Sequence, residues 1–150
     1  MIQEISPSTD SIVYDIFETV DYRDCFLLSF EKDRFQTVDD FAKVYFDSQP
    51  SWLRIVSMNI LSKVKNYNFQ VGESVGSWQI FARDSNEIVF GEGMGFMDYR
   101  FSMRLVERGV EVSTVVKLNG VMGKYYFSLV KLFHKKFVSI SLEHCVKRES

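Results

Sequence analysis

The spacing of hydrophobic residues predicts one long amphipathic helix at the C-terminal end of the chain. From residue 121 to residue 146, apolar side chains recur every three or four positions, and no proline interrupts them. The predicted apolar stripe consists of Met122, Tyr126, Leu129, Val130, Phe133, Phe137 and Ile140. The other side of the helix holds Lys124, Lys131, Lys135 and Lys136. A stripe so rich in aromatic rings needs a large apolar surface to pack against.

The hydrophobic period shortens to two from Trp78 onward, which is the spacing of strands with one buried face. In the clearest strand, the buried face would hold Met97, Tyr99, Phe101, Met103 and Leu105. The opposite face would hold Asp98, Arg100, Ser102 and Arg104. Turns separate the strands, so we expect an antiparallel meander that is apolar on one face and wet on the other. The final helix would cover the apolar face.

The N-terminal half predicts an arm, one strand and two shorter helices. Residues 1–20 are mixed in character and include a cluster of turn formers, so we expect a loosely ordered arm with one turn. The apolar run at 25–31 predicts the first strand. Thr37 is placed to cap a helix that ends before Pro50, and a second helical pattern begins near Ser51.

Together these elements predict one α+β domain over residues 1–150, in which a curved antiparallel sheet wraps around the long C-terminal helix. A chain of 150 residues is long enough for a single domain with a sizeable core. Hydrophobic residues make up 46% of the chain and aromatic residues 15%, which fits either a thick core or a roomy apolar pocket.

The charge balance and the cysteine count exclude several functional classes. The 18 basic and 20 acidic residues give a net charge of −2, which argues against a general nucleic-acid binder. Cys25 and Cys145 are too few for a disulfide framework or a zinc cluster, so we expect buried, reduced thiols in a cytoplasmic protein. No signal peptide or membrane span is expected, because no apolar run approaches the ~20 residues that a span needs.

Several short motifs follow one another in a characteristic order. They are DYRDCF at 21–26, PSW at 50–52, IVFGE at 88–92, MDYR at 97–100, TVV at 114–116 with Asn119, GKYY at 123–126 and FHK at 133–135. This order resembles an uncharacterised bacterial family of the START-like (SRPBCC) superfamily, which includes the birch-pollen allergen. The resemblance extends from about Asp21 to Phe137. It implies a helix-grip fold with an apolar cavity, and it implies no established activity.

Two positions depart from that family's pattern. Phe96 stands two residues before the strand aspartate, where family members often have a histidine. Leu132 stands where a proline often precedes the FHK motif. A mechanism that depends on a pair of histidines is therefore not expected in this chain.

The two aromatic-rich faces predict a ligand site between the sheet and the final helix. Its walls would be Trp52, Tyr99, Phe101, Met103, Thr114, Tyr126, Val130, Phe133, His134 and Phe137. Tyr126, His134 and Thr114 would orient the ligand, and the aromatic residues would enclose it. The alternative is that these side chains fill a solid core, which is the more frequent role for any one of them.

Among the candidate ligand residues, His134 has the widest range of possible chemical roles. It lies about a quarter turn from the centre of the predicted stripe. One interpretation makes it a hydrogen-bond donor or general base at a cavity rim. The other ties it to a strand carbonyl or carboxylate, and this is favoured because the sequence places no partner beside it. No metal or other cofactor is expected, since His134, His144 and the cysteines lack the helical spacing of metal ligands.

Two other polar patterns favour structural roles. Asp98 and Arg100 are expected to face solvent and to pair with Lys117 or Glu111 across the strands. The glycines between residues 91 and 95 favour a bulge or turn over a phosphate-binding loop, because a strand and not a helix follows them.

Three functional hypotheses follow. The preferred one is a non-enzymatic protein that binds a small apolar or amphipathic ligand in the helix-grip cavity. The second is an enzyme on the same fold, such as a cyclase, a dehydratase or a hydrolase-like protein, with His134 or Glu92 as acid or base. The third is a cavity-less interaction module, which would show a large exposed apolar patch or a homodimer face.

Overall fold

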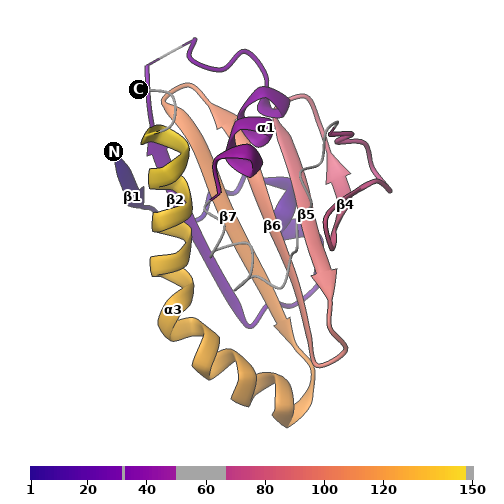
Figure 1. The fold of residues 1–150 in the computed structure, drawn as a ribbon. Coiled ribbons are helices and arrows are strands. Elements are labelled where there is room, and N and C mark those ends of the chain that lie inside the picture. Colours follow the sequence, from indigo (N-terminus) through magenta and orange to yellow (C-terminus); the bar gives the residue numbers. More distant parts are fainter. Residues whose placement is uncertain (32, 50–66, 148–150) are drawn as a thin grey trace.

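The described residues form one antiparallel sheet with helices on both faces (Figure 1). The structure is a computed structural model, and it describes residues 1–31, 33–49 and 67–147. The strands are β1 (Ile2–Glu4), β2 (Tyr22–Ser29), β3 (Ser74–Val75), β4 (Trp78–Arg83), β5 (Glu87–Gly93), β6 (Met97–Val106) and β7 (Gly109–Leu118). The helices are the 3-10 helix η1 (Ile12–Asp15) and the α-helices α1 (Val38–Ser48) and α3 (Gly120–Lys147).

The seven strands lie in the order β1-β2-β7-β6-β5-β4-β3, and each neighbouring pair of these strands is antiparallel. The predicted meander of strands is therefore confirmed, and so is the α+β class with a curved sheet and a long C-terminal helix. The first long strand, β2, starts three residues before the predicted run at 25–31 and pairs with β7, the last strand. This pairing places β2 beside the strand that leads into α3.

The first helix begins where the sequence predicts. The Thr37 hydroxyl accepts a hydrogen bond from the backbone N–H of Asp40 at 3.1 Å, and the Asp40 carboxylate accepts one from the N–H of Thr37. This reciprocal cap satisfies two of the amides that a helix start leaves without partners. The helix ends at Ser48, as expected before Pro50. The second predicted helix, near Ser51, lies outside the described residues.

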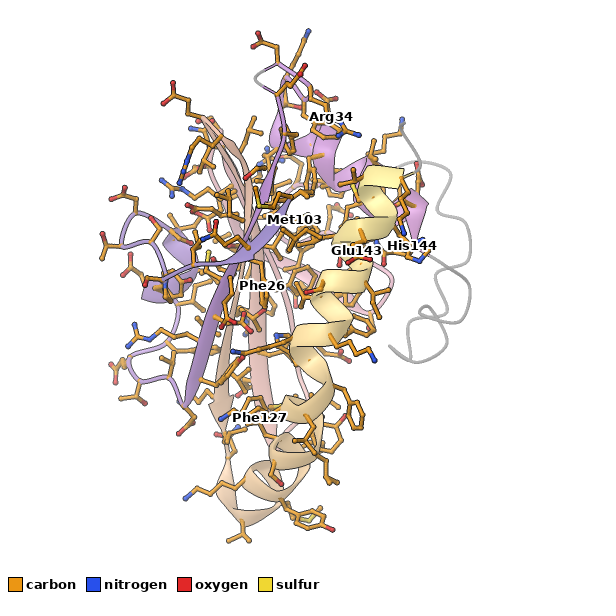
Figure 2. All side chains as sticks on the ribbon, turned by 90° about the vertical axis from the view of Figure 1, so that its left-hand side faces the viewer. Phe26, Arg34, Met103, Phe127, Glu143 and His144 are labelled. Atoms are coloured by element: carbon orange, nitrogen blue, oxygen red, sulfur yellow. The ribbon has the colours of Figure 1, made fainter. Side chains whose placement is uncertain are left out.

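α3 confirms the predicted C-terminal helix, but its inward side is not the predicted stripe. The buried residues of α3 are Gly123, Phe127, Val138, Ser141, Leu142 and Cys145. Figure 2 shows Phe127 between the helix and the strands. Met122, Leu129 and Phe133 from the predicted stripe are instead 73%, 51% and 68% exposed. At about 100° per residue, the helix is turned by roughly a third of a turn from the predicted orientation.

The close approach of α3 to the sheet explains this rotation. A Cβ atom on Gly123 would lie 2.2 Å from the carbonyl oxygen of Phe96, a distance that no side chain tolerates. Only the glycine can occupy this contact, so Gly123 has to face the sheet. Ser141 and Cys145, also small, are buried on the same side of the helix. A prediction from hydrophobicity alone turns the aromatic side of the helix toward the sheet, because glycine adds almost nothing to a hydrophobic stripe.

The back face of the sheet, opposite α1 and α3, is not wet as predicted. Val13 of η1 is fully buried against Val89 of β5 and Val115 of β7. Further apolar residues of the N-terminal segment pack around them, namely Ile12, Tyr14, Ile16, Phe17 and Val20. The N-terminal segment therefore covers part of a second apolar face, which alternation within the strands alone did not reveal.

A buried carboxylate holds the N-terminal segment in place. Glu87, which is 1% exposed, accepts hydrogen bonds from the Ser11 hydroxyl and from the backbone N–H of Ile12, the latter at 3.0 Å. Hydrogen bonds to an ionised acceptor are roughly twice as strong as neutral ones. β1 also pairs with β2 at the sheet edge. The loosely ordered arm expected for residues 1–20 is therefore wrong.

The pairing expected for Asp98 and Arg100 is also wrong. The Arg100 guanidinium lies 3.6 Å from the centroid of the Phe81 ring, stacked on the back face. Asp98 accepts a hydrogen bond from the Asn119 side chain at 3.1 Å. Glu111 pairs with Arg104 at 3.1 Å. The glycine-rich run at 91–95 is predicted to form a bulge or turn, and its last residues do form a turn, since β5 ends at Gly93 and β6 begins at residue 97.

Replacing Gly123 with alanine tests the close contact. Alanine is the better helix former by about 1 kcal/mol, yet the added Cβ would push against the Phe96 carbonyl. We expect Gly123→Ala to lower the free energy of unfolding by about 1–3 kcal/mol, measured by chemical denaturation. The control is Ser128→Ala at an exposed position of the same helix. Equal or greater stability in Gly123→Ala would show that α3 does not approach the sheet at this residue.

Candidate functional site

Rows of side chains cross the inner face of the sheet, the face that α1 and α3 cover. Such rows form because residues paired in register on neighbouring strands lie side by side. One row contains Asp24, Thr114, Phe101, Phe90 and Ile80. The next contains Tyr22, Val116, Tyr99 and Glu92. Asp24 and Tyr22 of β2 therefore form a polar end beside an apolar surface on β5 and β6.

His134 of α3 lies over this polar end. Its Nε2 atom is 3.1 Å from Oδ2 of Asp24, and the Tyr22 hydroxyl donates a hydrogen bond to the same oxygen at 2.8 Å. The Asp24 side chain is 2% exposed and the His134 side chain 20% exposed. We call Tyr22, Asp24 and His134 the polar anchor. It joins α3 to β2 through a buried carboxylate.

The polar anchor is not fully satisfied. Oδ1 of Asp24 is buried and accepts no hydrogen bond from any residue that the structure describes. Although Nε2 of His134 is within ion-pair distance of Oδ2, its N–H direction does not give an aligned hydrogen bond. A buried carboxylate oxygen without a donor costs free energy, so this group has unused capacity to accept a hydrogen bond.

Apolar and cationic neighbours surround the polar anchor. The ring of Phe127 lies 5.1 Å from that of Tyr22, and the His134 ring lies edge-on to Tyr22 at 6.0 Å. The ammonium of Lys131 lies 5.7 Å from the centroid of the Tyr22 ring. Burial, followed by the hydrogen bond to Asp24, raises the pKa of the Tyr22 phenol above its usual value. Tyr22 therefore stays protonated and continues to donate to Asp24 at neutral pH.

A second polar group lies two strands further across the inner face. The indole N–H of Trp78 donates to the Tyr99 hydroxyl at 2.7 Å, and that hydroxyl donates to Glu92 at 3.1 Å. Burial is the main cause that raises the pKa of Tyr99. Trp78, Tyr99 and Phe101 are only half-buried, and the rings of Trp78 and Phe101 lie 5.1 Å apart. Aromatic surface therefore remains accessible on this part of the sheet.

The predicted ligand residues fall into several groups. Tyr99 and Phe101 are half-buried on the inner face, Thr114 is buried beside Asp24, and Met103 is fully buried in the core (Figure 2). On α3, the half-buried predicted residues are Val130, His134 and Phe137.

Two predicted wall residues do not lie between α3 and the sheet, and one cannot be placed. Phe133 is 68% exposed, so its predicted inward position is wrong. Tyr126 is 38% exposed and packs on Phe96 at the flank of α3 that faces β6, with their ring centroids 5.0 Å apart. Trp52 lies outside the described residues. The helix rotation that moves Phe133 outward is the same one that brings His134 onto Asp24.

The two residues considered from the sequence as acid or base, His134 and Glu92, do not lie together. Glu92 lies three strands from β2 in its row, about 14 Å at the usual strand spacing. His134 therefore meets Asp24 and not Glu92. Among the described residues no group of three His, Cys, Asp or Glu side chains is arranged to hold a metal ion. Cys25 and Cys145 are both buried, as expected.

Sequence reasoning did not identify Asp24 and Tyr22 as site residues. A usable signal was present, because Asp24 is a charged residue at the start of the apolar run Cys25–Leu28. A charge in a buried strand needs a partner. Alternation along β2 places Asp24 on the same face as Tyr22 and Phe26, the face that α3 covers.

A hollow of about 600 Å³ lies elsewhere on the molecule, open to solvent. It is lined by Phe30, Asp33, Phe35, Gln36, Asn86, Leu105, Val106 and Glu107. These residues belong to the β2–α1 connection and to the far ends of β5 and β6. No predicted ligand residue and no member of the polar anchor lines it, so it does not locate the candidate site.

Comparison with known proteins gives one match. Residues 62–140 match the model of a family described as "Protein of unknown function (DUF2867)". The match covers just over half of the chain and includes His134 but not Tyr22 or Asp24. No curated protein and no solved structure matches the chain significantly.

The raised pKa of Tyr22 predicts a pH dependence of stability. A folded-state pKa above the unfolded value of about 10 stabilises the fold fully below pH 10, and this stabilisation is lost as the pH rises further. Tyr22→Phe should cost about 1.5–3 kcal/mol at neutral pH and make the fall in stability above about pH 10 shallower. Urea denaturation at several pH values measures both, with Tyr125→Phe, at a 71% exposed position, as control. An unchanged alkaline slope in Tyr22→Phe would contradict the burial of this phenol.

Proposed function

The chain belongs to the DUF2867 family of unknown function, and we propose that it binds a small amphipathic ligand on the inner face of the sheet, beside α3. The observation that supports this most directly is the unsatisfied, buried carboxylate oxygen of Asp24 at the end of a row of aromatic residues. We include the START-like helix-grip fold in this proposal. A curved antiparallel sheet with a long C-terminal helix, together with the ordered sequence motifs, supports it.

The polar anchor defines the chemistry of the ligand's polar group. Oδ1 of the Asp24 side chain is an oxygen that can accept hydrogen bonds. The ligand therefore presents a donor, such as a hydroxyl or an amine, and not a second carboxylate, which the Asp24 charge would repel. His134, with 20% of its side chain exposed, lies at the edge of the polar anchor that the ligand first meets.

The aromatic residues define the apolar part of the ligand. Phe101 is two strands from Asp24 along its row, about 10 Å at the usual strand spacing. A body of two or three fused or linked rings spans that distance. Phe137, which is half-buried on α3, contributes a second apolar wall. Rigid rings on both sides bind such a body with little loss of side-chain entropy.

The fluorescent probe N-phenyl-1-naphthylamine tests this proposal. It has three aromatic rings and a single N–H donor, and its emission increases in apolar surroundings. We expect saturable binding to the full chain that Phe101→Ala weakens about tenfold, the value expected for losing a buried phenyl ring. The matched control is Phe81→Ala, which removes a half-buried ring from the back face of the sheet.

A competition experiment tests the polar anchor separately. 1-Benzylnaphthalene has a similar apolar body but no hydrogen-bond donor. Its affinity, measured by displacement of N-phenyl-1-naphthylamine, should therefore be lower than that of the amine. Asp24→Asn keeps the side-chain volume but removes the carboxylate. This variant should reduce the difference in affinity between the two compounds. Equal affinity for both compounds in the unmodified protein, or an affinity that Phe101→Ala leaves unchanged, would refute the proposed site. Thermal melting of each variant establishes that it is folded.

A further inference from the structure

One side of α3 exposes apolar residues that are not part of the proposed ligand site. We define the outer face of α3 by Val121, Met122, Tyr125, Leu129 and Leu132, which are 84%, 73%, 71%, 51% and 75% exposed. They lie on the side of the helix opposite Gly123, Phe127 and Ser141. Monomeric proteins rarely expose such a continuous apolar patch, so it marks an interaction surface.

The charges that α3 itself carries around this patch have a single sign, although Lys135 pairs with Glu4 of β1 at 2.6 Å. Between residues 120 and 142 the chain contains four lysines and no aspartate or glutamate, although the whole protein has a net charge of −2. Lys124, Lys131 and Lys135 lie along one flank of the helix, and Lys136 lies next to Leu132. Lys124 and Lys136 are exposed, and neither forms an ion pair with the residues that the structure describes. A partner for this surface therefore has an apolar layer bordered by negative charge.

We propose that the outer face of α3 docks on the surface of a membrane that contains anionic lipids. The helix would lie in the plane of the interface, with its apolar residues among the acyl chains and its lysines beside the phosphate groups. Figure 1 shows the first turns of α3 at one end of the molecule, beyond the strands and away from α1, where they can meet a flat surface. Within the described chain no helix is long and apolar enough to cross a membrane.

Self-association through the same face fits the charges less well. A two-fold dimer would bring the lysines of one α3 close to those of the other, with no carboxylate between residues 120 and 142 to compensate. Like charges across an interface oppose binding. An anionic lipid surface instead offers many negative charges at once, and each lysine near such a surface adds to the attraction.

Co-sedimentation of the full chain with lipid vesicles tests this proposal. The protein should bind vesicles of phosphatidylcholine mixed with phosphatidylglycerol, bind pure phosphatidylcholine far more weakly, and dissociate as salt is raised. The double variant Lys124→Gln/Lys136→Gln should weaken binding by about fivefold for each lysine. Leu129→Ser/Leu132→Ser should abolish binding, while Lys43→Gln and Val71→Ser, at exposed positions on other parts of the chain, should not change it.

The contradicting outcomes are equally specific. Equal binding to both vesicle types, no binding to either, or binding that the serine variants retain would overturn the proposal.

Light scattering after size exclusion measures the oligomeric state and supplies another test. A dimer that Leu129→Ser/Leu132→Ser converts to a monomer would assign the outer face to self-association instead. Both serine substitutions replace residues at least half exposed, so circular dichroism should show an intact fold. Binding of N-phenyl-1-naphthylamine should survive them, which separates this surface from the ligand site.

Discussion

The rotation of α3 about its own axis is the constraint on which the rest of the structure depends. Gly123 fixes that rotation, because the helix comes so close to the start of β6 that a Cβ atom would meet the Phe96 carbonyl. A helix that is apolar on several sides has no single preferred orientation from hydrophobicity alone. A steric contact that only glycine can make removes this ambiguity, and it does so at the first turn after β7.

Two features of opposite chemistry follow from this one orientation. On the inward side, His134 lies over Asp24 and Tyr22 and forms a buried polar anchor whose carboxylate keeps one oxygen without a donor. On the other side, an apolar surface bordered by lysines remains exposed. A rotation by roughly a third of a turn would bury the aromatic side chains and separate His134 from Asp24. The proposed ligand site and the proposed membrane-facing surface therefore depend on the same contact.

The sequence predicts the elements of this fold better than their contacts. Capping by Thr37, alternation in β6 and β7, and the three-to-four spacing of α3 are local signals, and the structure confirms the helix start, the strands and the helix that they predict, though not the solvent-exposed back face. The features that the sequence did not predict depend on contacts between residues far apart in the chain. Glu87 binds the N-terminal segment from more than 70 residues away, and Asp24 meets His134 across more than 100. The spacing of hydrophobic residues within one segment carries no information about such long-range pairings.

Cysteine scanning along α3 tests the orientation of the helix most directly. Single cysteines at positions 122, 129, 130, 132 and 138 can be alkylated under native conditions, since the natural thiols at Cys25 and Cys145 are buried and should react slowly. Positions 122, 129 and 132 should react nearly as fast as in the unfolded chain, and positions 130 and 138 much more slowly. Protection of positions 122 and 129, with rapid labelling at 138, would place the aromatic stripe against the sheet and contradict the account.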